Sequence, residues 1–300
     1  MTKKKLSFSL SKIFRIENIF KNTLIFFPIL LSDRVANSTD ITMLVYGFLL
    51  FTFMTSICYA TNDFTDYKKD LLNKLKNKKT ILKIKNVIVL NFFLLLFLII
   101  LFNFTNLVNF YLILYLVFFY LYNFYIKSFY VLDIIFLTSF YILRLFYGSE
   151  LIGINISYWF LFFFITFFLI FSTFKRIIQI SVNNLVTRNN IIRYSIKDYP
   201  LLKGIVISST AVNLLIFLLY LYEINYPNTF ESFSAPETRY KQNILHLSMI
   251  FTVYCIGLIR IIKLVFQGKI KQDIYLFALK DKFNYCFLIG YLLFAYFHIN

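Results

Sequence analysis

The chain has 300 residues, of which 60% are hydrophobic and only 15% are charged, and its formal net charge is +17. Soluble domains carry about 25% charged residues, so this composition excludes a water-soluble protein and indicates a polytopic membrane protein. The apolar runs have the length of helices, which argues against an outer-membrane barrel, and the positive charge lies in loops on one side of the predicted membrane, which argues against a nucleic-acid partner.

Nine hydrophobic spans are predicted, so the expected fold is an all-α bundle of about nine transmembrane helices. The spans lie at 23–36, 41–60, 87–104, 108–126, 129–148, 158–174, 202–221, 244–264 and 283–299. Pro28 lies within the first span, where a kink or a tilt is expected. Residues 1–300 are expected to form a single transmembrane domain.

Lysine and arginine are distributed unevenly between the two ends of these spans. Segments 1–21, 61–86, 175–203 and 260–282, together with Lys127, hold 27 of the 31 lysines and arginines. All of them fall on one side of the membrane if successive spans alternate in direction, and the positive-inside rule makes that side cytoplasmic. The prediction is a multi-pass protein of the inner (cytoplasmic) membrane with a cytoplasmic N-terminus.

The sequence N-D-F-T-D-Y-K-K-D at positions 62–70 directly follows the second span. On a helix, Asn62, Asp66 and Asp70 share one face, and Asp63 lies beside them. The carboxylates repel one another unless a cation lies between them, and a hard cation such as Mg²⁺ that bridges to a phosphate suits this all-oxygen set. The plain alternative is the solvated end of a helix.

Further charged and polar residues collect at the same membrane face, where ionisable groups suggest function. The candidate substrate-binding residues are Arg15, Lys21, Asn22, Lys76, Lys79, Tyr122, Lys127, Asp133, Lys175, Arg176, Arg188, Tyr194 and Arg260. Each has a structural alternative. Lys175 and Arg176, which end the sixth span, are also suited to anchor a helix by snorkelling, the lysines of 74–85 suit a solvated basic face, and Asp133 suits a structural pair with Lys127 or Arg144.

These residues resemble the motifs of the UbiA-type intramembrane prenyltransferases, and most closely those of the decaprenyl-phosphate phosphoribosyltransferase branch. The run at 62–70 is similar to the first aspartate-rich motif of the family, N-D-x-x-D-x-x-x-D. The other matches, in chain order, are Arg15, Lys21, Asn22, Pro28, Lys76, Lys79, Tyr122, Lys127, Asp133, Leu143-Arg144, Gly148, Lys175-Arg176, Ile259-Arg260, Gly268, Asp273 and Asp281.

The resemblance implies a helical bundle in which Mg²⁺ and the aspartates hold the diphosphate of phosphoribosyl pyrophosphate at the cytoplasmic end. A polyprenyl phosphate would enter from the lipid and receive the 5-phosphoribosyl group as pyrophosphate leaves. The resemblance makes Asn62, Asp63, Asp66 and Asp70 the expected metal ligands. It makes Asp63, Asp66 and Lys127 the expected catalytic residues.

Two other functions stay open. The branch of the family with aromatic acceptors, such as 4-hydroxybenzoate, has a second aspartate-rich motif after the sixth span. Here no acidic residue occurs from 155 to 197, and the same region carries four basic residues between 175 and 193. One acidic cluster with a basic surface favours a phosphate acceptor over an aromatic one. The remaining alternative is a transporter or a lipid-binding membrane protein without catalysis, and the oligomeric state is left open.

Overall fold

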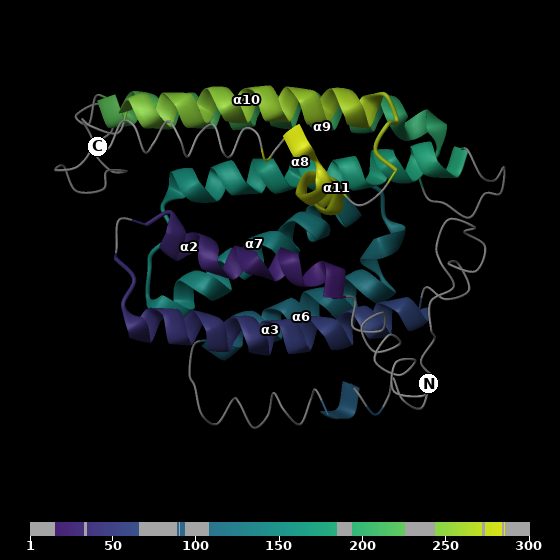
Figure 1. The fold of residues 1–300 in the computed structure, drawn as a ribbon. Coiled ribbons are helices and arrows are strands. Elements are labelled where there is room, and N and C mark those ends of the chain that lie inside the picture. The colour runs from purple at the N-terminus through teal and green to yellow at the C-terminus, as the bar shows by residue number, and fades with distance from the viewer. Residues whose placement is uncertain are drawn as a thin grey trace. The chain divides into compact units, whose positions relative to one another are not determined.

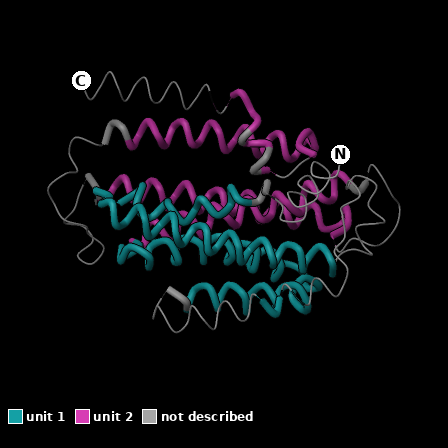
Figure 2. Tube along the Cα trace, turned by 60° about the horizontal axis from the view of Figure 1, so that its bottom comes forward, with its two compact units in different colours: residues 1–156 teal, residues 157–300 magenta. Residues whose placement is uncertain are grey.

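The computed structural model describes residues 16–32, 35–65, 89, 91–93, 108–184, 194–225, 244–271, 274–283 and 285. Within these ranges every regular element is a helix and there is no strand (Figure 1). The prediction of an all-α protein is therefore confirmed. The chain divides into two compact units, residues 1–156 and residues 157–300, which are coloured separately in Figure 2.

In its described residues, the first unit begins with the 3₁₀ helix η1 and contains three long helices. Its elements are η1 (Ile16–Phe26), α2 (Phe27–Leu30), α3 (Ser38–Thr65), α6 (Val108–Phe124), η2 (Ile126–Ser128) and α7 (Leu132–Ile152). Pro28 lies in the first turn of α2, where its missing N–H costs no helical hydrogen bond. The chain changes from 3₁₀ to α-helical geometry directly before the proline, and a kink or a tilt at Pro28 stays a prediction.

Helix α3 is longer than the predicted second span at both ends. At its start, the carboxylate of Asp40 accepts a hydrogen bond from the backbone N–H of Asn37 at 3.1 Å, which satisfies one of the donors exposed at a helix N-terminus. At its other end, the helix continues through the polar residues Thr61 to Thr65. The start of the aspartate-rich motif, Asn62 and Asp63, is therefore helical, as its spacing predicts.

Helix α7 packs closely against η1 through Gly148. A Cβ atom added at Gly148 would overlap the backbone carbonyl oxygen of Ile25 and lie 2.8 Å from its carbonyl carbon. The contact is to backbone, which cannot turn aside as a side chain can. The absence of a side chain at Gly148 therefore allows the backbones of η1 and α7 to touch, as small residues do between membrane helices.

Replacing Gly148 with alanine is expected to destabilise the protein by about 1–3 kcal/mol, because the added methyl group forces the two backbones apart. Thermal unfolding of the purified protein in detergent measures the effect. The matched control is Gly204→Ala in α9 (Tyr199–Asn225) of the second unit. An added Cβ meets no atom within 4 Å there, and alanine is the better helix former. Equal melting temperatures for the two variants would contradict the close packing at Gly148.

The second unit is also entirely helical in its described residues. Its elements are α8 (Tyr158–Asn184), η3 (Ile196–Asp198), α9 (Tyr199–Asn225), α10 (Ile244–Phe266) and α11 (Ile274–Lys280). Asn213, which is fully buried, joins three of these helices. Its Nδ2 donates to the Thr166 hydroxyl at 2.7 Å and to the Phe163 carbonyl at 2.9 Å, and its Oδ1 accepts from the Tyr254 hydroxyl.

Five of the described helices are long and apolar enough to cross a membrane: Ser38–Thr65, Leu132–Ile152, Tyr158–Val182, Ile196–Glu223 and Leu247–Phe266. The shorter apolar helices are Ile19–Leu30 and Phe110–Phe124. The predicted spans at 87–104 and 283–299 lie almost entirely outside the described residues, so nine spans stay a prediction. Helix α8 continues for ten residues beyond the predicted end of its span at 174, and the helix α11 was not predicted.

Candidate active site

The C-terminal end of α3 carries the described part of the aspartate-rich motif. Asn62 and Asp63 are half-buried there. The ammonium Nζ of Lys127 in η2 donates a hydrogen bond to Oδ1 of Asn62 at 3.1 Å. The structure therefore brings together Asn62 and Lys127, which are 65 residues apart and were both predicted as site residues. The oxygen of the Asn62 amide therefore faces the positive charge of Lys127.

The connection between α6 and α7 also meets this end of α3. The hydroxyl of Thr65 donates to Oδ1 of Asn123 at 3.1 Å, and Asn123 precedes Lys127 by four residues, or about one helical turn. Val131, the residue before α7, has a φ of +62°, which is a strained conformation for a β-branched residue. Strained backbone clusters at functional sites, and this connection carries the predicted site residue Lys127 and leads directly to Asp133 in the first turn of α7.

Tyr122 and Asp133 are both buried rather than exposed at a surface. Tyr122 packs edge-on against Phe140, with ring centroids 5.7 Å apart, and belongs to the apolar core of the first unit. Asp133 is 1% exposed at the start of α7, where a carboxylate is favoured by the helix dipole. Arg144, one of its suggested structural partners, contacts other groups, which are described next.

Arg144 lies at the centre of the first unit and is 2% exposed. Its Nε donates to Oδ1 of Asn22 at 3.0 Å, its Nη2 donates to the hydroxyls of Tyr115 at 3.1 Å and Tyr59 at 3.5 Å, and its Nη1 donates to the carbonyl of Phe140. The guanidinium also lies over three aromatic rings, those of Phe51, Tyr115 and Tyr141, at 5.2–5.6 Å from their centroids. All of these partners are neutral, so hydrogen bonds and ring quadrupoles stabilise the buried cation.

Asn22, a predicted substrate-binding residue, is 1% exposed in η1. Its Nδ2 donates to the hydroxyls of Thr55 at 3.0 Å and Thr52 at 3.1 Å on α3, while its Oδ1 accepts from Arg144. Both hydrogens of the amide and its oxygen are therefore engaged by protein groups. Its neighbour Lys21 is half-buried.

In the second unit, helix α8 places the adjacent predicted site residues Lys175 and Arg176 in different environments. Lys175 is exposed and Arg176 is 8% exposed. Nη1 of Arg176 donates to Oε1 of Gln179 at 2.6 Å, and its guanidinium lies 5.9 Å from the ring centroid of Tyr194, which is buried. Snorkelling therefore describes Lys175 better than Arg176, whose charge is turned toward the interior of its unit.

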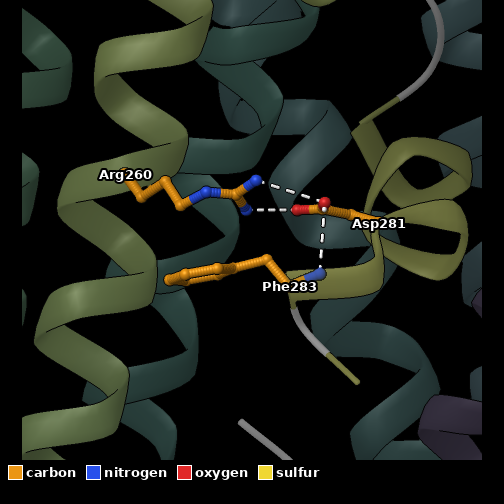
Figure 3. Close-up of polar contacts among 3 residues, drawn as sticks. All are labelled: Arg260, Asp281 and Phe283. Carbon is orange, nitrogen blue, oxygen red and sulfur yellow. Dashed lines mark hydrogen bonds and ion pairs between the residues drawn. The ribbon is translucent and has the colours of Figure 1, made fainter. Parts of the chain in front are cut away.

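Arg260 on α10 forms an ion pair with Asp281, which follows α11 (Figure 3). Both ends of the guanidinium fork reach the carboxylate, with Nη2 at 3.1 Å from Oδ1, and the fork lies 4.1 Å from the ring centroid of Phe283. A bidentate arginine–carboxylate pair of this kind is stronger and more directional than a single neutral hydrogen bond. The hydrogen bond from Arg260 is the main reason why the pKa of Asp281 lies below its ordinary value.

The lowered pKa gives the contribution of Asp281 to stability a definite pH dependence. A carboxyl group with a depressed pKa in the folded state stabilises the fold above its unfolded pKa of about 3.9, and this contribution is lost as the pH falls through the lower folded pKa. The melting temperature of Asp281→Asn is therefore expected to lie below that of the wild type by a constant amount from pH 7 to about pH 5. The difference should disappear in stronger acid, and a difference that grows as the pH falls would contradict the ion pair.

Six predicted site residues lie outside the described part of the chain: Arg15, Asp66, Asp70, Lys76, Lys79 and Arg188. Among the described residues, no three or more His, Cys, Asp and Glu side chains lie together so that they could hold a metal ion. The described part of the motif contributes the amide oxygen of Asn62 and the carboxylate of Asp63, and oxygen ligands of this kind fit Mg²⁺.

Arg144 and the side chains that contact it form an arginine centre, and this centre was not predicted as a site. The sequence indicates Arg144 only through a matching Leu-Arg pair and as one suggested partner of Asp133, and Tyr59 and Tyr115 are two of 23 tyrosines. The signal that could have identified the centre is an arginine in the middle of an apolar span, since such a residue must find polar partners inside the bundle.

A protein-family model matches most of the sequence. It describes the UbiA prenyltransferase family and aligns with residues 24–260. The chain belongs to this family. The members are membrane-embedded prenyltransferases that generally use divalent metal ions and act on lipid-linked prenyl substrates. The match spans the α3 motif, Lys127 and Arg144, and begins just after Asn22. No curated protein matches the chain.

Proposed function

We propose that the protein transfers a 5-phosphoribosyl group from phosphoribosyl pyrophosphate to a polyprenyl phosphate, in a Mg²⁺-dependent reaction at the cytoplasmic side of the inner membrane. In this proposal one UbiA-type domain covers residues 1–300. The end of α3, with Asn62, Asp63, Asp66 and Asp70, holds the metal-bound diphosphate of the donor.

The observation that carries the proposal is the contact between Asn62 and Lys127. It places the amide oxygen of Asn62, a group that can bind metal ions, next to the ammonium group of Lys127 at the end of one apolar helix. A leaving pyrophosphate carries several negative charges, and positive groups positioned before the reaction stabilise such charge most effectively. The absence of acidic residues from 155 to 197 supports a single metal–diphosphate site and an anionic acceptor.

In the proposed reaction, an oxygen of the polyprenyl phosphate forms a bond to C1 of the ribose. The bond between C1 and the pyrophosphate oxygen breaks, and its electron pair leaves with pyrophosphate. The metal, when bound, supplies positive charge to that leaving group. Lys127 adds a second positive charge at the same end of α3, and Asn62 and Asp63 orient the donor, so that positioning and charge stabilisation carry most of the catalysis.

The other substrate contacts in the proposal come from the remaining predicted residues. They are Arg15, Lys21, Lys76, Lys79, Tyr122, Asp133, Lys175, Arg176, Arg188, Tyr194 and Arg260. Asn22 is not among them, because protein groups engage its whole amide. Basic side chains predominate among them, which suits an acceptor that carries a phosphate.

The test is a transfer assay with purified protein, Mg²⁺, polyprenyl phosphate and phosphoribosyl pyrophosphate labelled in the ribose. The proposal predicts labelled lipid. The second candidate is transfer of a polyprenyl group from its diphosphate to an aromatic acceptor such as 4-hydroxybenzoate, and membership of a prenyltransferase family favours it. Turnover with that substrate pair and none with the first would establish the second candidate.

A further inference from the structure

One side of α3 carries a row of polar side chains that leads to the motif. The row consists of Thr52, Thr55, Tyr59, Asn62 and Thr65. Their spacings of three, four, three and three residues keep all five on one side of an α-helix. Between and around them the helix is apolar, and it is one of the five described helices that could cross a membrane.

Each member of the row is held by a side chain from another element. Asn22 of η1 donates to Thr52 and Thr55, Arg144 of α7 donates to Tyr59, and Lys127 of η2 donates to Asn62. Asn123 of α6 accepts from Thr65. Asn22 and Arg144 are also bonded to each other at 3.0 Å. The contacts therefore form a continuous series from the middle of α3 to its C-terminal end.

Such a row has a particular consequence in a membrane. An apolar helix is about equally well solvated by lipid on every side, so hydrophobicity does not fix its rotation about its own axis. Interhelical hydrogen bonds and close packing fix it instead. The rotation of α3 decides which way Asn62 and Asp63 point, because they lie only about one turn beyond Tyr59.

We propose that Asn22 and Arg144 are positioning residues that set the rotation of α3 and thereby present Asn62 and Asp63 to the metal-bound diphosphate. This inference rests on the proposed function for the identity of the ligand. It gives Asn22 a role that differs from the direct substrate contact expected from the sequence. It also explains why a fully engaged amide and a buried arginine adjoin the motif-bearing helix.

The test compares Asn22→Leu with Asn213→Leu. Both wild-type side chains are buried asparagines that donate two hydrogen bonds and accept one, but the partners of Asn213 are on α8 and α10 and none of them is on α3. The first readout is Mn²⁺ binding to the full-length protein, followed by electron paramagnetic resonance. Substitution of a residue that orients metal ligands typically lowers metal affinity by about 10–100-fold. Asn22→Leu should therefore weaken Mn²⁺ binding at least about 10-fold, and Asn213→Leu should leave it unchanged.

The second readout needs no metal. Cys58 lies on α3 and is 2% exposed, so the rate at which a maleimide labels it, measured by mass spectrometry of the Cys58 peptide, reports the rotation of α3. Asn22→Leu should raise this rate and Asn213→Leu should leave it unchanged. If Asn22→Leu does not fold, the double variant Thr52→Val and Thr55→Val, which keeps side-chain volume and removes the acceptors on α3, takes its place and should behave in the same way.

The outcomes separate this inference from the proposed function. The positioning role alone would be overturned if the wild type binds Mn²⁺ and the folded variant has the same Mn²⁺ affinity and the same rate of Cys58 labelling. Equal losses in the Asn22 and Asn213 variants would overturn it as well, because they would indicate general destabilisation. A wild-type protein that binds no Mn²⁺ would overturn the metal site of the proposed function, and the positioning role with it.

Discussion

Asp63→Asn is expected to lower turnover by about 10²–10³-fold, the usual cost of removing one preorganised charge-stabilising group from an active site. The substitution keeps the size of the side chain and removes its negative charge. In the proposed function, the metal that holds the diphosphate therefore loses a carboxylate ligand, while α3 keeps its packing. Initial rates of labelled-lipid formation, measured over a range of Mg²⁺ concentrations, give the effect. Higher Mg²⁺ should recover part of the activity if the variant weakens metal binding.

The matched control is Asp40→Asn at the opposite end of the same helix. Asp40 accepts a hydrogen bond from the backbone of Asn37 at the start of α3, and asparagine is an equally good residue for a helix N-terminus. This variant is expected to retain nearly full activity. Full activity of Asp63→Asn would remove the motif from the reaction.

The second large effect is expected on stability. Arg144→Met should lower the free energy of unfolding by about 2–4 kcal/mol, because it removes four buried hydrogen bonds and leaves the Oδ1 of Asn22 without its donor. Methionine fills most of the same volume, so the loss reports the polar contacts more than a cavity. Denaturant unfolding in detergent measures it, and Lys263→Met, an exposed lysine on α10, should change stability by less than about 0.5 kcal/mol.

Arg144→Lys separates charge from geometry. Lysine keeps the positive charge but lacks the planar fork that reaches Asn22, Tyr115 and Phe140 at the same time. It should therefore be nearly as destabilising as methionine. A lysine variant as stable as the wild type would mean that the charge alone, and not the network of hydrogen bonds, holds the first unit together.

Much of the fold could be predicted because its signals are local. Long apolar runs predict helices at the positions where α3, α7, α8, α9 and α10 occur, with errors mainly at the ends. Those errors have a common cause, because hydropathy marks the apolar part of a helix while hydrogen bonding continues into polar residues. Thr61 to Thr65 extend α3, and Gln179 to Asn184 extend α8, beyond their apolar segments.

The candidate site was only partly predictable because its contacts are long-range. Spacing alone places Asn62 and Asp63 on one helix end, but it does not reveal that Lys127 contacts Asn62 across 65 residues. Sequence reasoning treated Arg144 as part of a matching pattern, yet it bonds to Asn22, which lies 122 residues earlier. A single sequence does not show which residues form such pairs, because the partners come together only when the helices pack.

The most direct test of the proposed function offers the wild-type protein both substrate pairs in one reaction mixture. Polyprenyl phosphate with phosphoribosyl pyrophosphate and polyprenyl diphosphate with 4-hydroxybenzoate are supplied together with Mg²⁺, and mass spectrometry of the extracted lipid identifies the product. Phosphoribosyl polyprenyl phosphate as the main product, absent with Asp63→Asn and present with Asp40→Asn, is the predicted result. Prenylated 4-hydroxybenzoate as the main product would contradict the proposed function.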